Sequence, residues 1–120
     1  MSVRGIRGAI QIDRDDATLM RNAVVELMTG IMGANSLTAE DLISVLFTCT
    51  PDLTSDFPAA SARAMGLGHI PLICAVEMAV PESLPRTIRV LVHANTSLSH
   101  KDVSHIYLRG ATVLRKDLAQ

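Results

Sequence analysis

A single long helical repeat follows Asp15 and Asp16, and it limits how the rest of the chain can fold. Its apolar residues recur at helical spacing, and the two acidic residues stand at the positive end of the helix dipole. The repeat consists of Leu19, Met20, Ala23, Val24, Leu27, Met28 and Ile31. We expect one amphipathic helix that ends between Gly30 and Asn35. Its apolar face needs a sheet or another helix to cover it.

Segments rich in β-branched residues supply the strands of such a sheet. The predicted strands are residues 3–13, 43–50, 72–80 and 87–95, of which the last is the clearest. The remaining predicted elements are a capped short helix at 38–41, a second one at 57–66 with Pro58 in its first turn, a short helix running into a short strand at 103–108, and an apolar tail at 110–114. This alternation predicts an α/β (α+β) fold with one mixed sheet and helices on one face.

The size and composition of the chain indicate one compact domain over residues 1–120. It has 120 residues, of which 48% are hydrophobic. A chain of this size exposes much of its surface, and its mean hydropathy is +0.31. We therefore expect partner subunits to cover apolar surface in a homo-oligomer.

Charge and hydrophobicity argue against two classes of partner. The formal net charge is -1, and one Tyr and two Phe offer little for stacking on bases, so nucleic-acid binding is not expected. The chain has no apolar run near the roughly 20 residues that span a bilayer, and no apolar signal core after Met1. We expect a soluble, cytoplasmic protein with no membrane partner. Cys49 and Cys74 lie in apolar runs, which predicts reduced, buried thiols.

Two charged residues stand inside apolar strands. Arg89 lies within the strand 87–95, and Glu77 lies within the strand 72–80. Such residues are almost never fully buried unless they are paired. One interpretation is that they pair with each other or meet water on alternate strand faces. The other is that they line a binding site for a small substrate.

Strand alternation predicts where these residues point, because residues of opposite parity face opposite sides of a sheet. Cys74 and Glu77 are three apart, so in a regular strand they diverge. If both line binding sites, they line different copies of the site, at a subunit boundary. Arg4 and Arg7 also diverge; Arg4 shares the face of Ile6, which makes it the more unusual of the two, but alternation does not choose between them.

Other chemistries lack their sequence patterns. The four histidines, His69, His93, His100 and His105, show no metal-ligand spacing. The glycines near Arg4 and Arg7 lack the length and the lysine of a phosphate loop, and no serine stands in a nucleophile elbow. Cys74 fits a core thiol better than a nucleophile. We expect no metal and no cofactor.

Five groups of residues, in this order, resemble those of the monofunctional bacterial chorismate mutases of the AroH class. They are Arg4-Gly5-Ile6-Arg7-Gly8-Ala9; Thr50-Pro51-Asp52-Leu53-Thr54 with Asp56-Phe57-Pro58-Ala59; Cys74 with Glu77-Met78; Ile88-Arg89-Val90; and His105-Ile106-Tyr107-Leu108 with Val113-Leu114-Arg115. The resemblance runs from residue 3 to about residue 118. Each group is weak alone, but their order, spacing and joint presence are specific.

The resemblance implies a homotrimer of pseudo-α/β-barrel type, with sheets packed at its centre, helices outside and three active sites between subunits. It also implies the intramolecular Claisen rearrangement of chorismate to prephenate, a step towards phenylalanine and tyrosine. That reaction is pericyclic, so it involves no cofactor, covalent adduct or acid–base step.

The same resemblance implies roles for individual residues. Arg89 would stabilise the negative charge on the breaking ether oxygen, and Glu77 would accept a hydrogen bond from the substrate hydroxyl. Arg7 would bind a carboxylate. The other implied substrate-binding residues are Tyr107 and Cys74 beside the substrate, Phe57, Ala59, Leu72 and Ile73 as an apolar wall from the neighbouring subunit, and Arg63, Leu114 and Arg115 near the entrance. Arg4 is left as structural.

The sequence departs from the family pattern at two positions. Ala60 stands where many relatives carry lysine, and Ile73 stands where a relative can have threonine, so we expect altered substrate affinity.

Two other functions are alternatives. Small trimeric enamine/imine deaminases, which resemble this architecture, also fix a carboxylate with an interfacial arginine. A non-catalytic carboxylate-binding or regulatory module is the remaining alternative.

Overall fold

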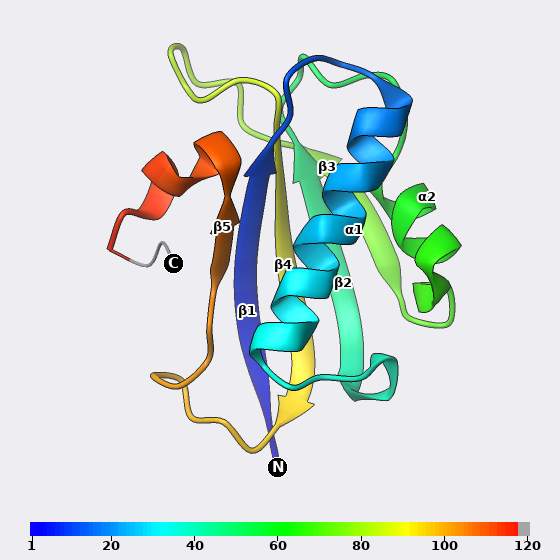
Figure 1. Cartoon of the computed structure of the whole chain (residues 1–120), viewed down its shortest axis with the longest axis vertical. Coiled ribbons are helices and arrows are strands. Elements are labelled where there is room, and N and C mark those ends of the chain that lie inside the picture. The colour runs from blue at the N-terminus through cyan, green and yellow to red at the C-terminus, as the bar shows by residue number, and fades with distance from the viewer. Residues whose placement is uncertain (118–120) are drawn as a thin grey trace.

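The computed structural model describes residues 1–117, so the last three residues of the predicted domain lie outside the described residues. Five strands form one sheet in the order β3-β2-β4-β1-β5 (Figure 1). They are β1 (Ser2–Gln11), β2 (Leu42–Cys49), β3 (Leu72–Val76), β4 (Thr87–Thr96) and β5 (Ile106–Leu108). The central strand β4 is antiparallel to β1 and β2, whereas the edge strands β3 and β5 run parallel to their neighbours. The predicted mixed sheet of an α+β fold is confirmed.

Helix α1 (Ala17–Ala34) crosses one face of this sheet, and α2 (Pro58–Ala62) packs against α1 beside β3 (Figure 1). Asp16 caps α1 by accepting a hydrogen bond from the N–H of Leu19 at 2.9 Å. Three short helical turns complete the described part of the chain: η1 (Ala39–Asp41), η2 (Arg63–Leu67), which turns at Gly66 with φ +100°, and η3 (Arg109–Arg115). The long helix and the capped turn at 38–41 are therefore confirmed.

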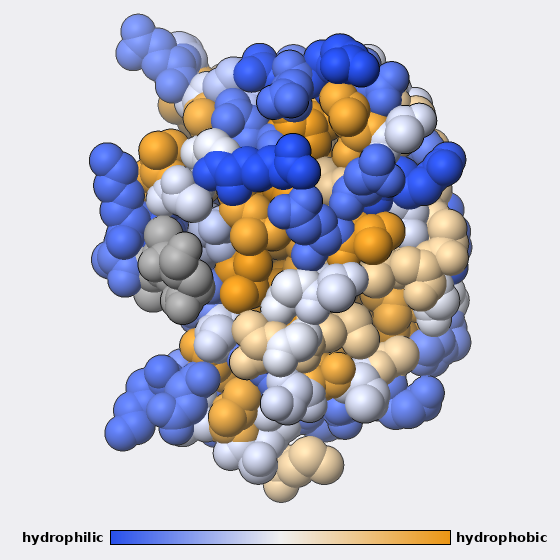
Figure 2. Space-filling model, in the orientation of Figure 1, coloured by the Kyte–Doolittle hydropathy of each residue, from blue (hydrophilic) through white to orange (hydrophobic). Residues whose placement is uncertain are grey.

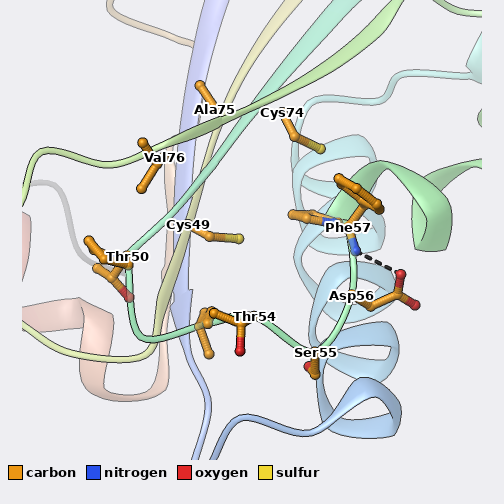
Figure 3. Close-up of a pocket in the computed structure, with 12 residues that line it drawn as sticks. Cys49, Thr50, Thr54, Ser55, Asp56, Phe57, Cys74, Ala75 and Val76 are labelled. Carbon is orange, nitrogen blue, oxygen red and sulfur yellow. Dashed lines mark hydrogen bonds between the residues drawn. The ribbon is translucent and has the colours of Figure 1, made fainter.

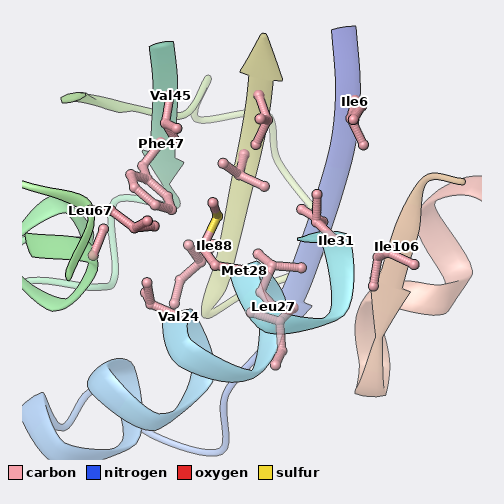
Figure 4. Packing of buried hydrophobic residues seen from close by; sticks show 14 of the residues in the cluster. Ile6, Val24, Leu27, Met28, Ile31, Val45, Phe47, Leu67, Ile88 and Ile106 are labelled. Carbon is pink, nitrogen blue, oxygen red and sulfur yellow. The ribbon is translucent and has the colours of Figure 1, made fainter. Parts of the chain in front are cut away.

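The hydrophobic core lies between α1 and the sheet (Figure 4). Its fully buried side chains come from α1, β1, β2 and β4 and include Ile6, Ile10, Leu27, Met28, Ile31, Phe47, Ile88 and Val92. Gly8 lets the helix approach β1, because a Cβ there would lie 2.8 Å from Cδ1 of Ile31 and 3.0 Å from Cδ1 of Leu27. We call this side of the sheet the covered face.

The opposite side, which we call the open face, carries the alternate residues of the same strands. Part of it near β5 is covered by η3, through contacts of Ala9 with Tyr107 and Ala111. Among residues 1–117, no helix covers the remainder. Figure 2 shows the molecule from the side of α1, where hydrophilic side chains are spread over the surface and hydrophobic ones show between them without forming one broad area.

Two predicted elements differ in the structure. The strand expected over 72–80 ends at Val76, because the N–H of Glu77 makes the last bond to β2, at the carbonyl of Cys49, and β2 ends there. No helix forms at 103–105, where Asn35 binds both backbone groups of Ser104 just before β5 begins. The tail expected at 110–114 is part of η3.

No helix within the described part of the chain is long and apolar enough to cross a membrane.

Candidate active site

A cavity of about 270 Å³ opens on the open face of the sheet. Strand register brings its residues together: Arg89 of β4 lies between Ala9 of β1 and Thr48 of β2, and Arg7 of β1 is opposite Leu91. The residues that line the cavity are Arg7, Gly8, Leu46, Thr48, Glu77, Arg89, Val90, Leu91 and Tyr107. Four of the predicted site residues, Arg7, Glu77, Arg89 and Tyr107, therefore meet in one place.

Arg89 and Glu77, which both line this cavity, form an ion pair. Nε of Arg89 lies 3.3 Å from Oε2 of Glu77, so the interpretation that the two residues pair with each other is confirmed. The same carboxylate accepts hydrogen bonds from Oγ1 of Thr48 at 3.1 Å and from the N–H of Met78 at 3.1 Å. The side chains remain 44% and 29% exposed. A guanidinium has five N–H donors, so the pair still presents donors to a ligand.

Arg7 lies at the β5 side of the cavity. Its backbone N–H donates to Nδ1 of His105 at 3.0 Å. Burial, followed by the charges of Arg7 and Arg115, lowers the pKa of His105. Tyr107 is buried against Ala9, with Leu114 packed beside them.

Arg115 lies at the end of η3, where Asp117 holds it in a two-point ion pair. Its Nη2 is 2.8 Å from one Asp117 oxygen, and its Nε is 3.1 Å from the other. The hydrogen bond with Arg115 lowers the pKa of Asp117, and the charge of Arg7 acts in the same direction. Three arginines therefore lie on the same side of the molecule, and their positive charges suit a bound anion. They are Arg7, Arg89 and Arg115.

A second hollow of about 500 Å³ lies at the β3 edge, on the covered-face side, between the segment 50–58 and the ends of β2 and β3 (Figure 3). Phe57, which is 67% exposed, borders it, and the side chains of Cys49 and Cys74 point towards Phe57. Both cysteines are free thiols, as predicted, but each is half-buried rather than fully buried. Burial, with a smaller contribution from Cys74, raises the pKa of Cys49 to about 12.

The loop that leads to Phe57 is held by Asp15. Its carboxylate accepts the N–H groups of Thr54 and Ser55 and the Thr54 hydroxyl, at 2.9 to 3.1 Å. The Ser55 side chain, followed by the backbone N–H of Thr54, lowers the pKa of Asp15.

The predicted site residues therefore form two groups. Arg7, Glu77, Arg89, Tyr107, Leu114 and Arg115 belong to the open face, whereas Phe57, Ala59, Arg63, Leu72, Ile73 and Cys74 belong to the β3–α2 edge. In the second group, Ala59 and Leu72 pack against the chain's own core, while Arg63 is exposed and Ile73 is 64% exposed. Cys74 and Glu77 lie on opposite faces, as alternation predicted.

Sequence reasoning missed Thr48 and the contact that His105 makes. Thr48 becomes visible only through the register of β2 with β4, which no local pattern gives. Arg4, by contrast, donates from Nε to the carbonyl of Leu98 at 3.0 Å, which supports its structural assignment. Within residues 1–117, no three His, Cys, Asp or Glu side chains come together in a metal-binding group.

Similarity to known proteins covers nearly the whole chain. Residues 3–118 match the family model described as chorismate mutase type I. The chain is 48% identical over 117 residues to the chorismate mutase AroH of Thermus thermophilus, which covers 97% of this chain and 96% of the relative. It is 35% identical to the chorismate mutase AroH of Bacillus subtilis, over 99% of this chain and 94% of the relative. A solved chorismate mutase from Clostridium thermocellum superposes with a TM-score of 0.90 at 40% identity, over 92% of this chain and 98% of that one.

Proposed function

The chain belongs to the chorismate mutase type I family and is thus an isomerase of aromatic amino-acid biosynthesis, and from this premise we propose how its side chains perform the reaction. The substrate is chorismate, and the product of its Claisen rearrangement is prephenate. The family match favours this function over a deaminase or a non-catalytic carboxylate-binding module. The observation that carries the mechanism is the Arg89–Glu77 pair inside the open-face cavity.

Arg89 is the residue that stabilises the breaking bond. As the ether bond lengthens, negative charge develops on its oxygen, and a guanidinium held in place beforehand stabilises that charge without reorganisation. Glu77 fixes the guanidinium through Nε, and Thr48 fixes Glu77. Glu77 also accepts the substrate hydroxyl and faces the positive character of the ring.

Arg7, Tyr107 and Arg115 hold the carboxylates of the substrate. Chorismate is a flexible dianion, and it rearranges only in a compact conformer, so much of the acceleration comes from holding that conformer. An arginine binds a carboxylate through two parallel hydrogen bonds, which fixes orientation as well as position. Asp117 shows this geometry on Arg115. The substrate carboxylate would replace Asp117 there.

A direct assay tests this function. Purified protein is incubated with chorismate, and the loss of chorismate is followed by ultraviolet absorbance while prephenate is identified among the products. We expect accelerated conversion to prephenate. No acceleration, or loss without prephenate, would contradict the proposal.

We also propose that the active enzyme is a homotrimer whose sites form between subunits. Two features support this. The two groups of site residues lie apart within one chain, at the open-face cavity and at the β3–α2 edge, and exposed apolar side chains lie near the second group. Phe57, Ile73, Val76 and Met78 are all more than half exposed. The open-face group of one subunit and the edge group of its neighbour would then enclose one substrate.

Mixing two inactive variants tests this arrangement. An Arg89→Ala chain has a damaged open-face group, and a Phe57→Ala chain has a damaged edge group. A mixed trimer contains sites with both groups intact, so we expect part of the activity to return after subunit exchange. Mixing Arg89→Ala with Arg7→Ala is the matched control: both changes damage the open-face group, so no activity should return. Equal results from the two mixtures, with exchange confirmed, would argue against interfacial sites.

A further inference from the structure

His105 closes a gap at the start of the β1–β5 ladder. The two strands pair from Gly8 opposite Ile106 to Ile10 opposite Leu108, so Arg7 lies one residue before the ladder begins. In a strand, the N–H and C=O of one residue point to the same side. The N–H of Arg7 points to the β5 side, where Nδ1 of His105 accepts it at 3.0 Å. The imidazole thus replaces a strand carbonyl at the backbone of Arg7.

Asn35 holds the residue that precedes His105. Asn35 is 2% exposed and caps the C-terminal end of α1. Its amide nitrogen donates to the carbonyls of Ile31 and Ser104, each at 2.9 Å, and its amide oxygen accepts the N–H of Ser104 at 2.8 Å. A buried polar group whose bonds are all made is rigid and costly to disturb. A continuous set of contacts therefore runs from α1 through Ser104 and His105 to Arg7.

The contact with Arg7 requires a neutral imidazole, because Nδ1 accepts a hydrogen bond only when it carries no proton. The charged and titratable groups around His105 are Arg7 on β1, Tyr107 on β5, and Arg115 on η3 with its partner Asp117. Burial and the two arginines lower the pKa of His105, so the neutral form is maintained at neutral pH. Protonation would remove the acceptor and add a third positive charge beside Arg7 and Arg115.

We propose that His105, held through Asn35 and Ser104, is a positioning residue for Arg7, and that substrate affinity falls when His105 takes up a proton. The proposal deepens the function proposed above and rests on Arg7 binding a substrate carboxylate. The direction in pH follows from the lowered pKa. The hydrogen bond from Arg7 to His105 is complete at neutral pH. It is lost as the pH falls through the pKa of His105 in the folded protein, which lies below the usual value of about 6.5.

Two substitutions separate the acceptor from the rest of the side chain. His105→Asn places an amide oxygen near the position of Nδ1 and does not titrate, whereas His105→Leu has the same branched shape and no acceptor. A neutral hydrogen bond contributes about 0.5–1.5 kcal/mol, so we expect His105→Leu to raise KM for chorismate about 3- to 10-fold at pH 7.5, with a smaller change in kcat. His105→Asn should restore most of the wild-type KM. Exposed His69 provides the control, His69→Asn.

The pH profile separates positioning from a merely structural role. Wild-type protein and His69→Asn should show KM rising as pH falls from 7 to 5, whereas His105→Asn should show a flat KM over that range. If His105→Asn keeps the wild-type dependence, or if the Leu and Asn variants share one KM at neutral pH, the proposal is wrong.

The backbone amide of Arg7 gives a readout that does not depend on activity. In ligand-free wild-type protein, its ¹H–¹⁵N signal should move with pH as His105 titrates, and the movement should be absent from His105→Asn. An Arg7 amide that ignores His105 titration overturns the positioning contact. Wild-type protein that fails to convert chorismate would instead contradict the proposed function, while the amide titration would still decide the contact.

Discussion

The two faces of the sheet are built from alternate residues of the same strands, yet they have opposite properties. On β4, Ile88 and Val92 are fully buried against α1 on the covered face. Between them, Arg89 and Leu91 line the cavity on the open face. Neighbouring residues of one strand thus belong to the core and to the site.

The cost of burying charge explains this division. An arginine buried beneath α1 on the covered face would have to leave water without a partner, which is expensive. On the open face it needs only a carboxylate, and Glu77 provides one at 3.3 Å. The covered face in turn anchors the strands, so the backbone beneath Arg7 and Arg89 is held by the core. Stability and catalysis are therefore separable by residue parity, which mutations on the two faces can test.

Replacing Arg89 with alanine should have the largest effect on activity. Loss of one preorganised donor costs about 10²–10³ in kcat, and we expect at least this for a charged donor at the breaking bond. Arg89→Lys should remain badly impaired, because a lysine cannot reproduce the geometry of the guanidinium. Thermal unfolding should change little, since the side chain is 44% exposed. Steady-state kinetics and calorimetry measure both quantities.

Arg21→Ala, at an exposed position on α1, is the control for Arg89 and should leave both quantities near wild type. A large loss of stability in Arg89→Ala would show that the open face also supports the fold. It would contradict the assignment of stability to one face and catalysis to the other.

Two leucines, one on each face, should show that the covered face carries more of the stability than the open face. Leu27 is fully buried on the covered face, so Leu27→Ala should reduce the free energy of unfolding by about 2–5 kcal/mol. Leu91 is half-buried on the open face. Leu91→Ala should reduce the free energy of unfolding by less than Leu27→Ala does. Any reduction should grow as the protein is diluted, because the open face would be covered by a partner subunit. Urea denaturation at two protein concentrations measures this, and equal, concentration-independent losses would contradict it.

The fold was predictable where a local pattern carries it. The repeat from Leu19 to Ile31 and the acidic residues before it follow from spacing and side-chain chemistry, and α1 agrees with both, since it begins directly after Asp16. The end of β3 at Val76 was not predictable, because residues beyond it are equally suited to a strand and only the end of β2 at Cys49 stops the pairing. The non-helical segment at Ser104 is likewise held by Asn35, which lies 69 residues away.

The site was predictable in its residues but not in their arrangement. Glu77 and Arg89 come from segments on either side of β2, so their contact, and the part played by Thr48, needs the strand order β3-β2-β4. Alternation placed Arg4 on the covered side and Arg7 on the other. It could not show that Arg4 binds the Leu98 carbonyl, so the family resemblance, rather than the residues, selected Arg7.

The smallest effect is expected where the covered face is incomplete, at the hollow beside Phe57. Asp15→Asn would leave one of the two oxygens that hold the Thr54–Ser55 backbone, so the loop to Phe57 would be held less firmly. For the loss of about one net hydrogen bond we expect KM to rise only about 2- to 5-fold, with kcat nearly unchanged. Exposed Asp13→Asn is the matched control.

The pH dependence distinguishes this loop effect from that of His105. Hydrogen bonding lowers the pKa of Asp15 from 3.8. The contribution of Asp15 to holding the loop is therefore fully present above pH 3.8, and it is lost only as the pH falls through the lower pKa of the folded protein. Between pH 5 and 8, the ratio of KM in Asp15→Asn to that of wild type should therefore stay constant, whereas the ratio for His105→Asn should change. A ratio for Asp15→Asn that drifts in this range would show that the edge hollow and the open face are coupled, and that the two faces are less independent than their residues suggest.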